Sequence, residues 1–272
     1  EAMAVIHKLI EKHKVDIIAL GNGTASRESE KVISDYIHET KSKVQYVIVN
    51  EAGASVYSAS KLATEEFPNF DTGERSSTSM ARRLQDPLAE LVKIEPKAIG
   101  VGQYQHDMNQ NKLEEQLNNT VEDCVNHVGV DLNTASAALL SYISGINKTL
   151  AKNIVVYREE NGAFKSRKEL LKVAKLGPKA FEQSAGFLRI REGKEVLDRT
   201  SVHPESYQKT KELLSLLNLN EKDIAEGKGK DIAKMISALP GGMKALEEKL
   251  AIGSFTLKDI VEALAKPGRD PR

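Results

Sequence analysis

The sequence predicts an α/β region in the first third of the chain, followed by an all-α region that runs to the end. Two short apolar runs alternate with helical patterns before residue 65, which is typical of parallel strands joined by a helix. From about residue 109 onward, apolar residues recur at helical spacing and no segment has a convincing strand pattern. Because 272 residues exceed one ordinary domain, we expect two or three domains.

The α/β region is expected to contain two buried strands, over residues 15–20 and 44–49. Helical spacing predicts helices over 3–13, 26–38 and 52–63. Such continuous apolar strands predict a parallel sheet that is covered on both faces. Two strands do not make a complete α/β sheet, so we expect further strands ahead of the first residue.

The character of the sequence changes after residue 69. Residues 70–80 are polar and rich in serine, and they predict a surface loop. A helix is expected over 81–94, with an interruption at Pro87, because proline lacks the N–H that a helix interior needs. Residues 100–107 have no clear period and are expected to connect the two regions.

The all-α region is expected to open with a long helix over 110–128, with one apolar and one acidic face. The apolar stripe consists of Leu113, Leu117, Val121, Val125 and Val128, and the acidic face of Glu114, Glu115, Glu122 and Asp123. Short helices are expected over 133–190 and 203–272, two of them beginning with capping boxes. The capping pairs are Ser166 with Glu169 and Thr256 with Asp259.

A helix-hairpin-helix motif is predicted in the middle of the chain, at Leu140, Ile143, Gly145, Ile146 and Ala151. Glycine in such a hairpin allows positive φ and a close approach of the backbone. N–H groups at the start of the second helix are then unpaired and lie at the positive end of its dipole, where they can bind a phosphate. Asn147 stands where the motif has its second glycine, and asparagine tolerates the left-handed region.

The pattern recurs about thirty residues later, centred on Gly177, with Lys175 in place of the first glycine. Its other positions are Leu170, Val173, Leu176 and Phe181, and Pro178 opens the following helix. Charge supports a role in binding, because nine basic residues stand against three acidic ones between Ser141 and Ala180, a local net of +6 in a chain of zero net charge. The basic residues are Lys148, Lys152, Arg158, Lys165, Arg167, Lys168, Lys172, Lys175 and Lys179, and the acidic ones are Glu159, Glu160 and Glu169.

These observations predict sequence-nonspecific binding of DNA or RNA through the sugar–phosphate backbone. The predicted nucleic-acid-binding residues are Gly145, Ile146, Asn147, Lys148, Thr149, Lys152, Lys175, Gly177 and Lys179. Helical hairpins also serve as packing turns, and the acidic face of 110–128 fits an alternative role as a protein-interaction scaffold.

Several runs of residues strongly resemble the bacterial Tex family of transcription accessory proteins. The runs are Gly21-Asn22-Gly23-Thr24-Ala25-Ser26-Arg27-Glu28, residues 82–94 and 96–107, Asn133-Thr134-Ala135-Ser136, and residues 198–205 and 266–272. The resemblance implies the second half of an RNase H-like domain of the YqgF type over 1–107, a tandem helix-hairpin-helix domain over 108–192 and a second helical module over 193–272. It also implies a role in transcription, with DNA or RNA and RNA polymerase or other transcription components as partners.

The resemblance also raises the question of nuclease chemistry, for which Glu51 and Asp86 are the candidate carboxylates. RNase H-like nucleases need several carboxylates that converge on two metal ions. Asp86 immediately precedes Pro87, as helix caps often do, and Glu51 fits a solvated residue at a strand end. Because two acids do not hold two metals, we expect no catalytic residue, metal or cofactor in this chain. A metal-dependent nuclease or resolvase activity of the full-length protein stays as the alternative.

The composition restricts the class of protein further. A single cysteine, Cys124, excludes a disulfide framework and any cysteine-based zinc site. No apolar run approaches the ~20 residues that cross a bilayer, and the first residues have the pattern of an amphipathic helix, so we expect no signal peptide, no membrane partner and a cytoplasmic protein.

Overall fold

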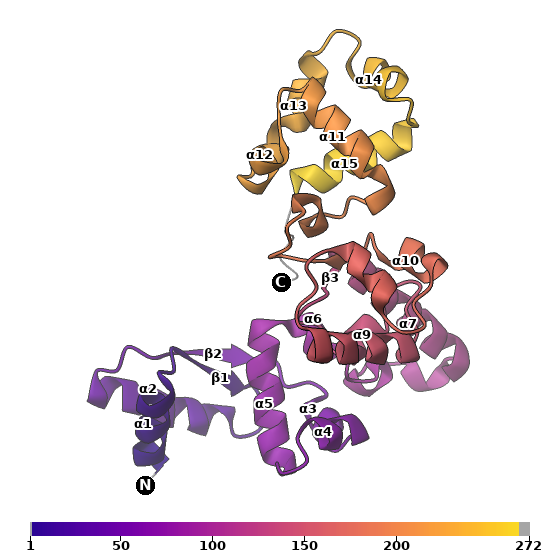
Figure 1. Cartoon of the computed structure of the whole chain (residues 1–272). Coiled ribbons are helices and arrows are strands. Elements are labelled where there is room, and N and C mark those ends of the chain that lie inside the picture. Colours follow the sequence, from indigo (N-terminus) through magenta and orange to yellow (C-terminus); the bar gives the residue numbers. More distant parts are fainter. Residues whose placement is uncertain (1, 267–272) are drawn as a thin grey trace. The chain divides into compact units, whose positions relative to one another are not determined.

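A computed structural model describes residues 2–266 (Figure 1). The chain divides into two compact units, with the boundary between Leu117 and Asn118. This boundary lies within the long helix α7 (Gln110–Val128), whose bounds equal those that the sequence predicts. The predicted domain limits after residues 107 and 192 stay predictions.

The first unit begins with a strand–helix–strand arrangement preceded by a helix. Its elements are α1 (Ala2–His13), β1 (Ile17–Gly21), α2 (Ser26–Thr40) and β2 (Gln45–Val49). The two strands are parallel and pair Ile17 with Gln45 through Gly21 with Val49, which confirms the predicted parallel pair. Ile10, Tyr36 and Val44 form the small core between α1, α2 and the strands.

The expectation that both faces of this sheet are covered is wrong for the described residues. Ile17 and Ile48 are each 50% exposed and Val47 is 37% exposed. The helices of the described residues leave these three side chains partly exposed. A continuous apolar run therefore predicts a strand here, but it does not show that both faces of the sheet are covered.

The remainder of the first unit is helical, and here residues 70–80 depart from the prediction. The elements are α3 (Ala54–Ser58), α4 (Lys61–Glu66), α5 (Thr72–Gln85), α6 (Pro87–Leu91), η1 (Pro96–Ile99) and η2 (Gln105–Asp107). The predicted surface loop at 70–80 is instead most of α5, which begins with a capping box between Asp71 and Glu74. Its serines do not make it a loop, because Ser79 is buried and donates to Glu90.

The first part of the second unit contains two short helical pairs and one pair of two-residue strands. It comprises β3 (Val130–Asp131), α8 (Ala137–Leu140), α9 (Lys148–Asn161), η3 (Arg167–Lys172), α10 (Pro178–Ser184) and β4 (Leu188–Arg189). β3 and β4 pair in parallel, so the expectation of no strand after residue 109 is wrong. A strand of two residues is too short to show a period of two.

The rest of the second unit is a bundle of short helices. Its elements are η4 (Val196–Arg199), η5 (Pro204–Ser206), α11 (Tyr207–Leu216), α12 (Glu221–Ala225), η6 (Lys228–Asp231), α13 (Ile232–Ala238), α14 (Gly242–Leu250) and α15 (Ser254–Ala265). Aliphatic side chains fill its core, among them Leu213, Ile236 and Leu257. Residues 267–272 of the predicted closing segment lie outside the described residues.

Neither predicted capping box forms. The Ser166 hydroxyl makes no capping bond to η3, and Thr256 lies inside α15, which begins at Ser254. Asn220 and Asp223 form a capping box at the start of α12, which the sequence analysis does not predict. Within residues 2–266, no helix is both long enough and apolar enough to cross a membrane.

Candidate nucleic-acid interface

The first hairpin joins α8 to α9 through a turn that requires glycine. Gly145 has a φ of +82°, in the region that L-residues avoid. A Cβ added there would lie 2.7 Å from the Cβ of Gln183 and 3.3 Å from the carbonyl oxygen of Ala180. Both the conformation and the neighbouring helix α10 therefore exclude a side chain. Next to the glycine, Ile146 is buried and anchors the turn.

Asn147 does not take the left-handed conformation that its place in the motif suggests. Its φ of −83° and ψ of 171° are extended, and its side-chain oxygen accepts from the N–H of Leu150 at 2.9 Å. The earlier interpretation is wrong because a short polar side chain at this point serves as the N-cap of α9. Among the hydrogen bonds of the described residues, none uses the N–H of Asn147, Lys148 or Thr149. The start of α9 therefore has three backbone donors available.

The second hairpin repeats this backbone geometry with different side chains. Lys175 has a φ of +66°, so it occupies the position of Gly145. Gly177 caps α10 with a φ of −86° and a ψ of 174°, and so matches Asn147. In both hairpins the residue between these two donates its N–H to the carbonyl three residues before, Ile146 to Ile143 at 2.9 Å and Leu176 to Val173 at 3.1 Å. Thirty residues separate every matching pair.

The two motifs contact each other in a reciprocal way. The turn at Gly145 lies against Gln183 of α10. In the other direction, the side-chain amide of Asn153 in α9 donates to the carbonyl oxygen of Ala174 in the second turn, at 2.7 Å. Because Asn153 and Gln183 are themselves thirty residues apart, each turn packs on the matching site of the other motif. The pair is therefore a pseudo-twofold unit.

The predicted contact residues divide into exposed and supporting ones. Asn147, Lys148, Thr149, Lys152, Lys175 and Lys179 are exposed, Gly145 and Gly177 are partly exposed, and Ile146 is buried. Polar and charged side chains are thus on the surface around both turns, and the apolar one is in the core.

The local charge of this segment is carried by lysines alone. Arg158 donates inward to the carbonyl oxygens of Leu132 and Ala135, each at 3.0 Å. Arg167 is 1% exposed. Counting both arginines as surface charge was therefore wrong, because a composition count does not show where a side chain points. The seven exposed cations are Lys148, Lys152, Lys165, Lys168, Lys172, Lys175 and Lys179.

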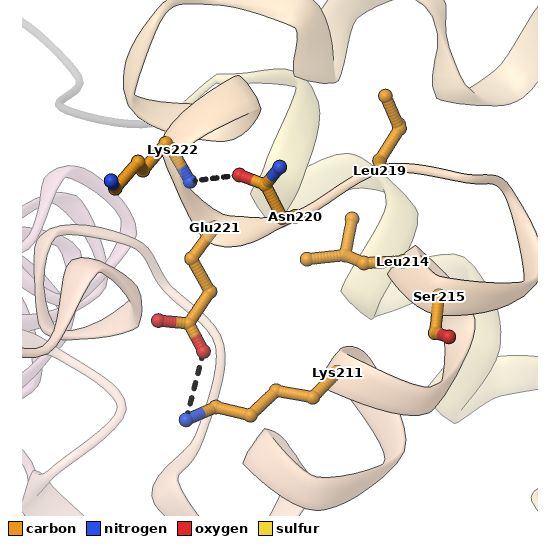
Figure 2. Close-up of a pocket in the computed structure, with 7 residues that line it drawn as sticks. All are labelled: Lys211, Leu214, Ser215, Leu219, Asn220, Glu221 and Lys222. Carbon is orange, nitrogen blue, oxygen red and sulfur yellow. Dashed lines mark hydrogen bonds and ion pairs between the residues drawn. The ribbon is translucent and has the colours of Figure 1, made fainter.

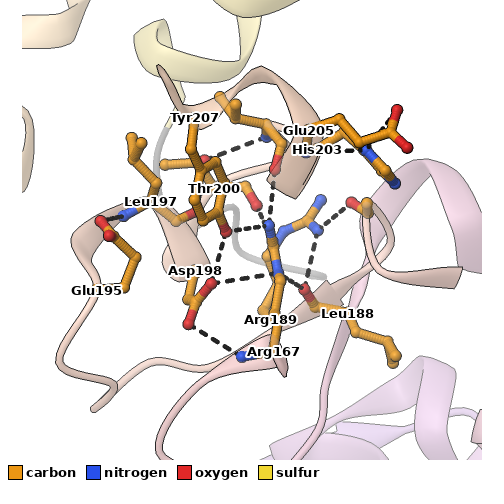
Figure 3. A network of polar contacts seen from close by, with 12 residues as sticks. Arg167, Leu188, Arg189, Glu195, Leu197, Asp198, Thr200, His203, Glu205 and Tyr207 are labelled. Atoms are coloured by element: carbon orange, nitrogen blue, oxygen red, sulfur yellow. Dashed lines mark hydrogen bonds and ion pairs between the residues drawn. The ribbon is translucent and has the colours of Figure 1, made fainter. Parts of the chain in front are cut away.

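Arg167 is instead the centre of a buried polar network (Figure 3). Its guanidinium donates to four groups: the carbonyl oxygens of Leu188, Thr200 and Val202 and the hydroxyl of Tyr207. Asp198 accepts from the backbone N–H of Arg167 at 3.1 Å and from the Tyr207 hydroxyl at 2.5 Å. Burial lowers the pKa of Arg167 and raises the pKa of Tyr207, and the carboxylate of Asp198 opposes the first shift and adds to the second. The network fastens the start of the second hairpin to the segment that leads into α11.

Two asparagines that the site prediction did not include also hold the first hairpin and its surroundings. Asn126 of α7 donates to the carbonyl oxygen of Tyr142 and accepts from the N–H of Ser144, both at 3.0 Å. Asn133 exchanges two hydrogen bonds with the backbone of Phe164, at 2.8 and 3.0 Å. Neither residue has a spacing signal, because each pairs with backbone far along the chain.

The two candidate nuclease carboxylates serve different elements. Asp86 caps α6 by accepting from the N–H of Ala89 at 3.1 Å. Glu51 follows β2, and its carboxylate lies against Gly21 and Gly23 at the end of β1. Over residues 2–266, no cluster of three or more His, Cys, Asp or Glu side chains is placed to hold a metal ion.

A separate hollow lies in the C-terminal bundle between α11 and α12 (Figure 2). An ion pair of 2.8 Å between Lys211 and Glu221 crosses its edge. Its lining residues are Lys211, Leu214, Ser215, Leu219, Asn220, Glu221 and Lys222, none of which is a predicted contact.

Comparison with known domain families divides the chain in the same order as the structure. Residues 1–85 match the Tex protein YqgF-like domain. Residues 125–189 match the helix-hairpin-helix motif, and residues 195–272 match an HHH domain. The fold is therefore a Tex-type YqgF-like region followed by two helix-hairpin-helix regions.

Curated relatives align with almost the whole chain. The transcriptional accessory protein Tex of Neisseria gonorrhoeae is 53% identical over 99% of this chain and 35% of its own length. Protein tex of Bordetella pertussis is 53% identical over 97% of this chain and 32% of its own length. S1 RNA-binding domain-containing protein 1 of Homo sapiens is 39% identical over 96% of this chain and 31% of its own length. The chain spans about a third of these relatives and belongs to the Tex family.

Proposed function

We propose that this chain binds nucleic acid through the sugar–phosphate backbone, without sequence preference, within a protein that supports transcription. The observation that carries the proposal is the pseudo-twofold pair of hairpins, with unpaired backbone donors at the start of α9 and lysines around both turns. The helix-hairpin-helix matches and the transcription accessory names of the relatives support the same function.

The first hairpin would bind one phosphate through backbone donors. The N–H groups of Asn147, Lys148 and Thr149 have no protein acceptor in the described residues and lie at the positive end of the dipole of α9. A phosphate satisfies both the donors and the dipole. The ammonium groups of Lys148 and Lys152 would add positive charge one turn apart. Gly145 and Ile146 would contribute by holding the turn.

The second hairpin would combine backbone donors with side-chain charge. Pro178 opens α10 and has no N–H, but no side chain caps this helix, so the N–H groups of Gly177, Lys179 and Ala180 have no acceptor in the described residues. Lys175 and Lys179 are exposed here, and Gly177 allows the backbone to approach a phosphate. Lys175 stands in a strained conformation that glycine would adopt freely, and such strain is often kept where it serves a function.

The two candidate carboxylates have contacts of their own. Asp86 accepts from the N–H of Ala89 as the cap of α6, and the carboxylate of Glu51 lies against the turn after β1. DNA and RNA both remain as ligands, because contacts to phosphates do not distinguish them. RNA polymerase or another transcription component is the proposed protein partner.

A salt titration of binding to duplex and single-stranded DNA and RNA tests this function. If four to six lysines contact phosphates at once, the log–log slope for duplex DNA should be roughly −4 to −5, at about 0.9 per phosphate. Lys148→Ala should make the slope less steep by about 0.9, and Lys222→Ala, in the C-terminal bundle, should leave it unchanged. A wild-type slope shallower than about −1 would contradict backbone binding.

A further inference from the structure

The end of β1 and the turn that follows it have two glycines that the backbone conformation does not require. Gly21 and Gly23 are absent from the glycines with positive φ. What excludes a side chain is the carboxylate of Glu51: a Cβ at Gly21 would lie 2.6 Å from its Oε2, and a Cβ at Gly23 would overlap its Oε1. The turn is therefore a cradle that holds the anionic group of Glu51.

This cradle leads directly into the N-terminus of α2, a helix of fifteen residues whose N-cap, Ala25, provides no side-chain acceptor. Among the hydrogen bonds of the described residues, none uses the N–H groups of Gly23, Thr24, Ala25, Arg27 or Glu28. Unpaired donors at the start of a long helix favour an anion. The anionic group that lies nearest to both cradle glycines is the carboxylate of Glu51.

A second, independent feature is a buried guanidinium with unused donors. Arg83 of α5 is 5% exposed, and its Nη1 donates to the carbonyl oxygens of Asn50 and Ala52, at 2.7 and 2.9 Å. Its Nε and Nη2 are buried and have no hydrogen-bond partner in the described part of the chain. Such unpaired donors on a buried cation are costly, so they indicate an anion that can approach them.

Arg83 and the cradle belong to the same region. α5 contacts both β1 and β2 and crosses the carboxyl ends of the strands in Figure 1. Burial lowers the pKa of Arg83, and the negative charges of Glu90 and Glu51 oppose that shift. Met80, one turn before Arg83 on α5, lies beside Gly21, where a Cβ would be 2.8 Å from its Sδ.

We propose that the turn 21–24, the first turn of α2 and Arg83 form a binding site for a phosphate group, and that the carboxylate of Glu51 occupies this site in the structure. A phosphate would displace the flexible end of Glu51, accept from the free N–H groups, and pair with Nε and Nη2 of Arg83. The site lies in the first unit and does not depend on the hairpins of the second. Inorganic phosphate and the phosphates of an oligonucleotide share the chemistry that the site recognises.

The test measures binding of inorganic phosphate, dT4 and 5′-phosphorylated dT4 by titration calorimetry, using the whole chain with Lys148→Ala and Lys179→Ala to weaken the hairpins. If Glu51 fills the site about nine-tenths of the time, Glu51→Gln should tighten phosphate binding about tenfold. Gly23→Ala should abolish it by filling the cradle, and only a side-chain end has to move, so the fold should persist. Glu65→Gln, an exposed glutamate outside the site, should bind like its parent.

The three ligands identify the source of the phosphate. Binding of inorganic phosphate supports a free anion as the ligand. Binding of only the 5′-phosphorylated oligonucleotide supports a nucleotide end, and equal binding of both oligonucleotides supports a phosphodiester within the chain. In each case the binding must change with Glu51→Gln and Gly23→Ala. The proposal fails if Glu51→Gln and Gly23→Ala bind all three ligands like their parent while folded by circular dichroism. It also fails if Glu51→Gln binds none of them. The salt slope for duplex DNA tests the hairpins in a separate measurement, so its outcome does not decide the present proposal.

Discussion

Lys175→Gly should stabilise the chain and weaken its hold on nucleic acid at the same time. Lys175 has a φ of +66°, and the left-handed region costs an L-residue about 1–2 kcal/mol. Glycine loses about 0.5–1 kcal/mol more conformational entropy on folding, so the net gain in unfolding free energy should be about 0.5–1 kcal/mol. Removing one phosphate contact should make the salt slope less steep by about 0.9. For a variant and a wild type that bind equally at 1 M salt, this difference lowers the affinity of the variant about eightfold at 0.1 M salt.

Urea denaturation and a salt titration on duplex DNA measure the two effects. Lys41→Gly is a matched control, because Lys41 is an exposed lysine with a φ of +53° in the first unit. It should stabilise the chain by a similar amount and leave the salt slope unchanged. If Lys175→Gly keeps the wild-type slope and affinity, Lys175 does not contact phosphate. If Lys41→Gly lowers affinity as much as Lys175→Gly, the effect comes from net charge and the assignment to the hairpin is refuted.

Three further changes follow from individual contacts. Gly145→Val should reduce affinity about equally for all sequences of one nucleic-acid type, because it disturbs several backbone donors together. Lys222→Ala is the reference variant. A folded Gly145→Val variant that binds as well as the wild type would show that the hairpin is a packing turn. Asp86→Ala should lower the unfolding free energy by about 1 kcal/mol through loss of a helix cap, and metal-dependent cleavage that this change abolishes would instead indicate a nuclease. Tyr207→Phe should cost about 1–3 kcal/mol in urea denaturation, because it removes a partner from the buried carboxylate of Asp198; an unchanged midpoint would mean that the network contributes little to stability.

The sequence was sufficient for elements with a strong period and insufficient where capping or short pairing decides the structure. The helix at 110–128 and the parallel strands follow from apolar spacing. Residues 70–80 lack such spacing, and α5 forms there because Asp71 and Glu74 cap it and because Ser79 finds a buried partner in Glu90. The capping pair could have been found in the sequence, whereas the partner of Ser79 could not.

For the candidate site, the sequence located both hairpins but not the direction of every side chain. The thirty-residue repeat placed Gly145 and Lys175 at matching turns, as their positive φ values show. Charge counting could not separate surface lysines from Arg167, whose partners lie more than twenty residues away along the chain. The extended conformation of Asn147 could not be predicted from the sequence, because an asparagine at this position fits both the glycine of the motif and a helix N-cap.

The reciprocal packing of the hairpins also bears on how a ligand is measured. The turn at Gly145 packs against α10, and the second turn accepts a hydrogen bond from Asn153, so these contacts oppose movement of one hairpin relative to the other. The two proposed phosphate-binding points would therefore lie at a nearly constant separation. A single strand could bend its backbone to match that separation, at a cost in entropy, whereas a duplex would have to present two phosphates at that separation already. Discrimination would then depend on the geometry of the nucleic-acid helix and its groove width, with no reading of the bases.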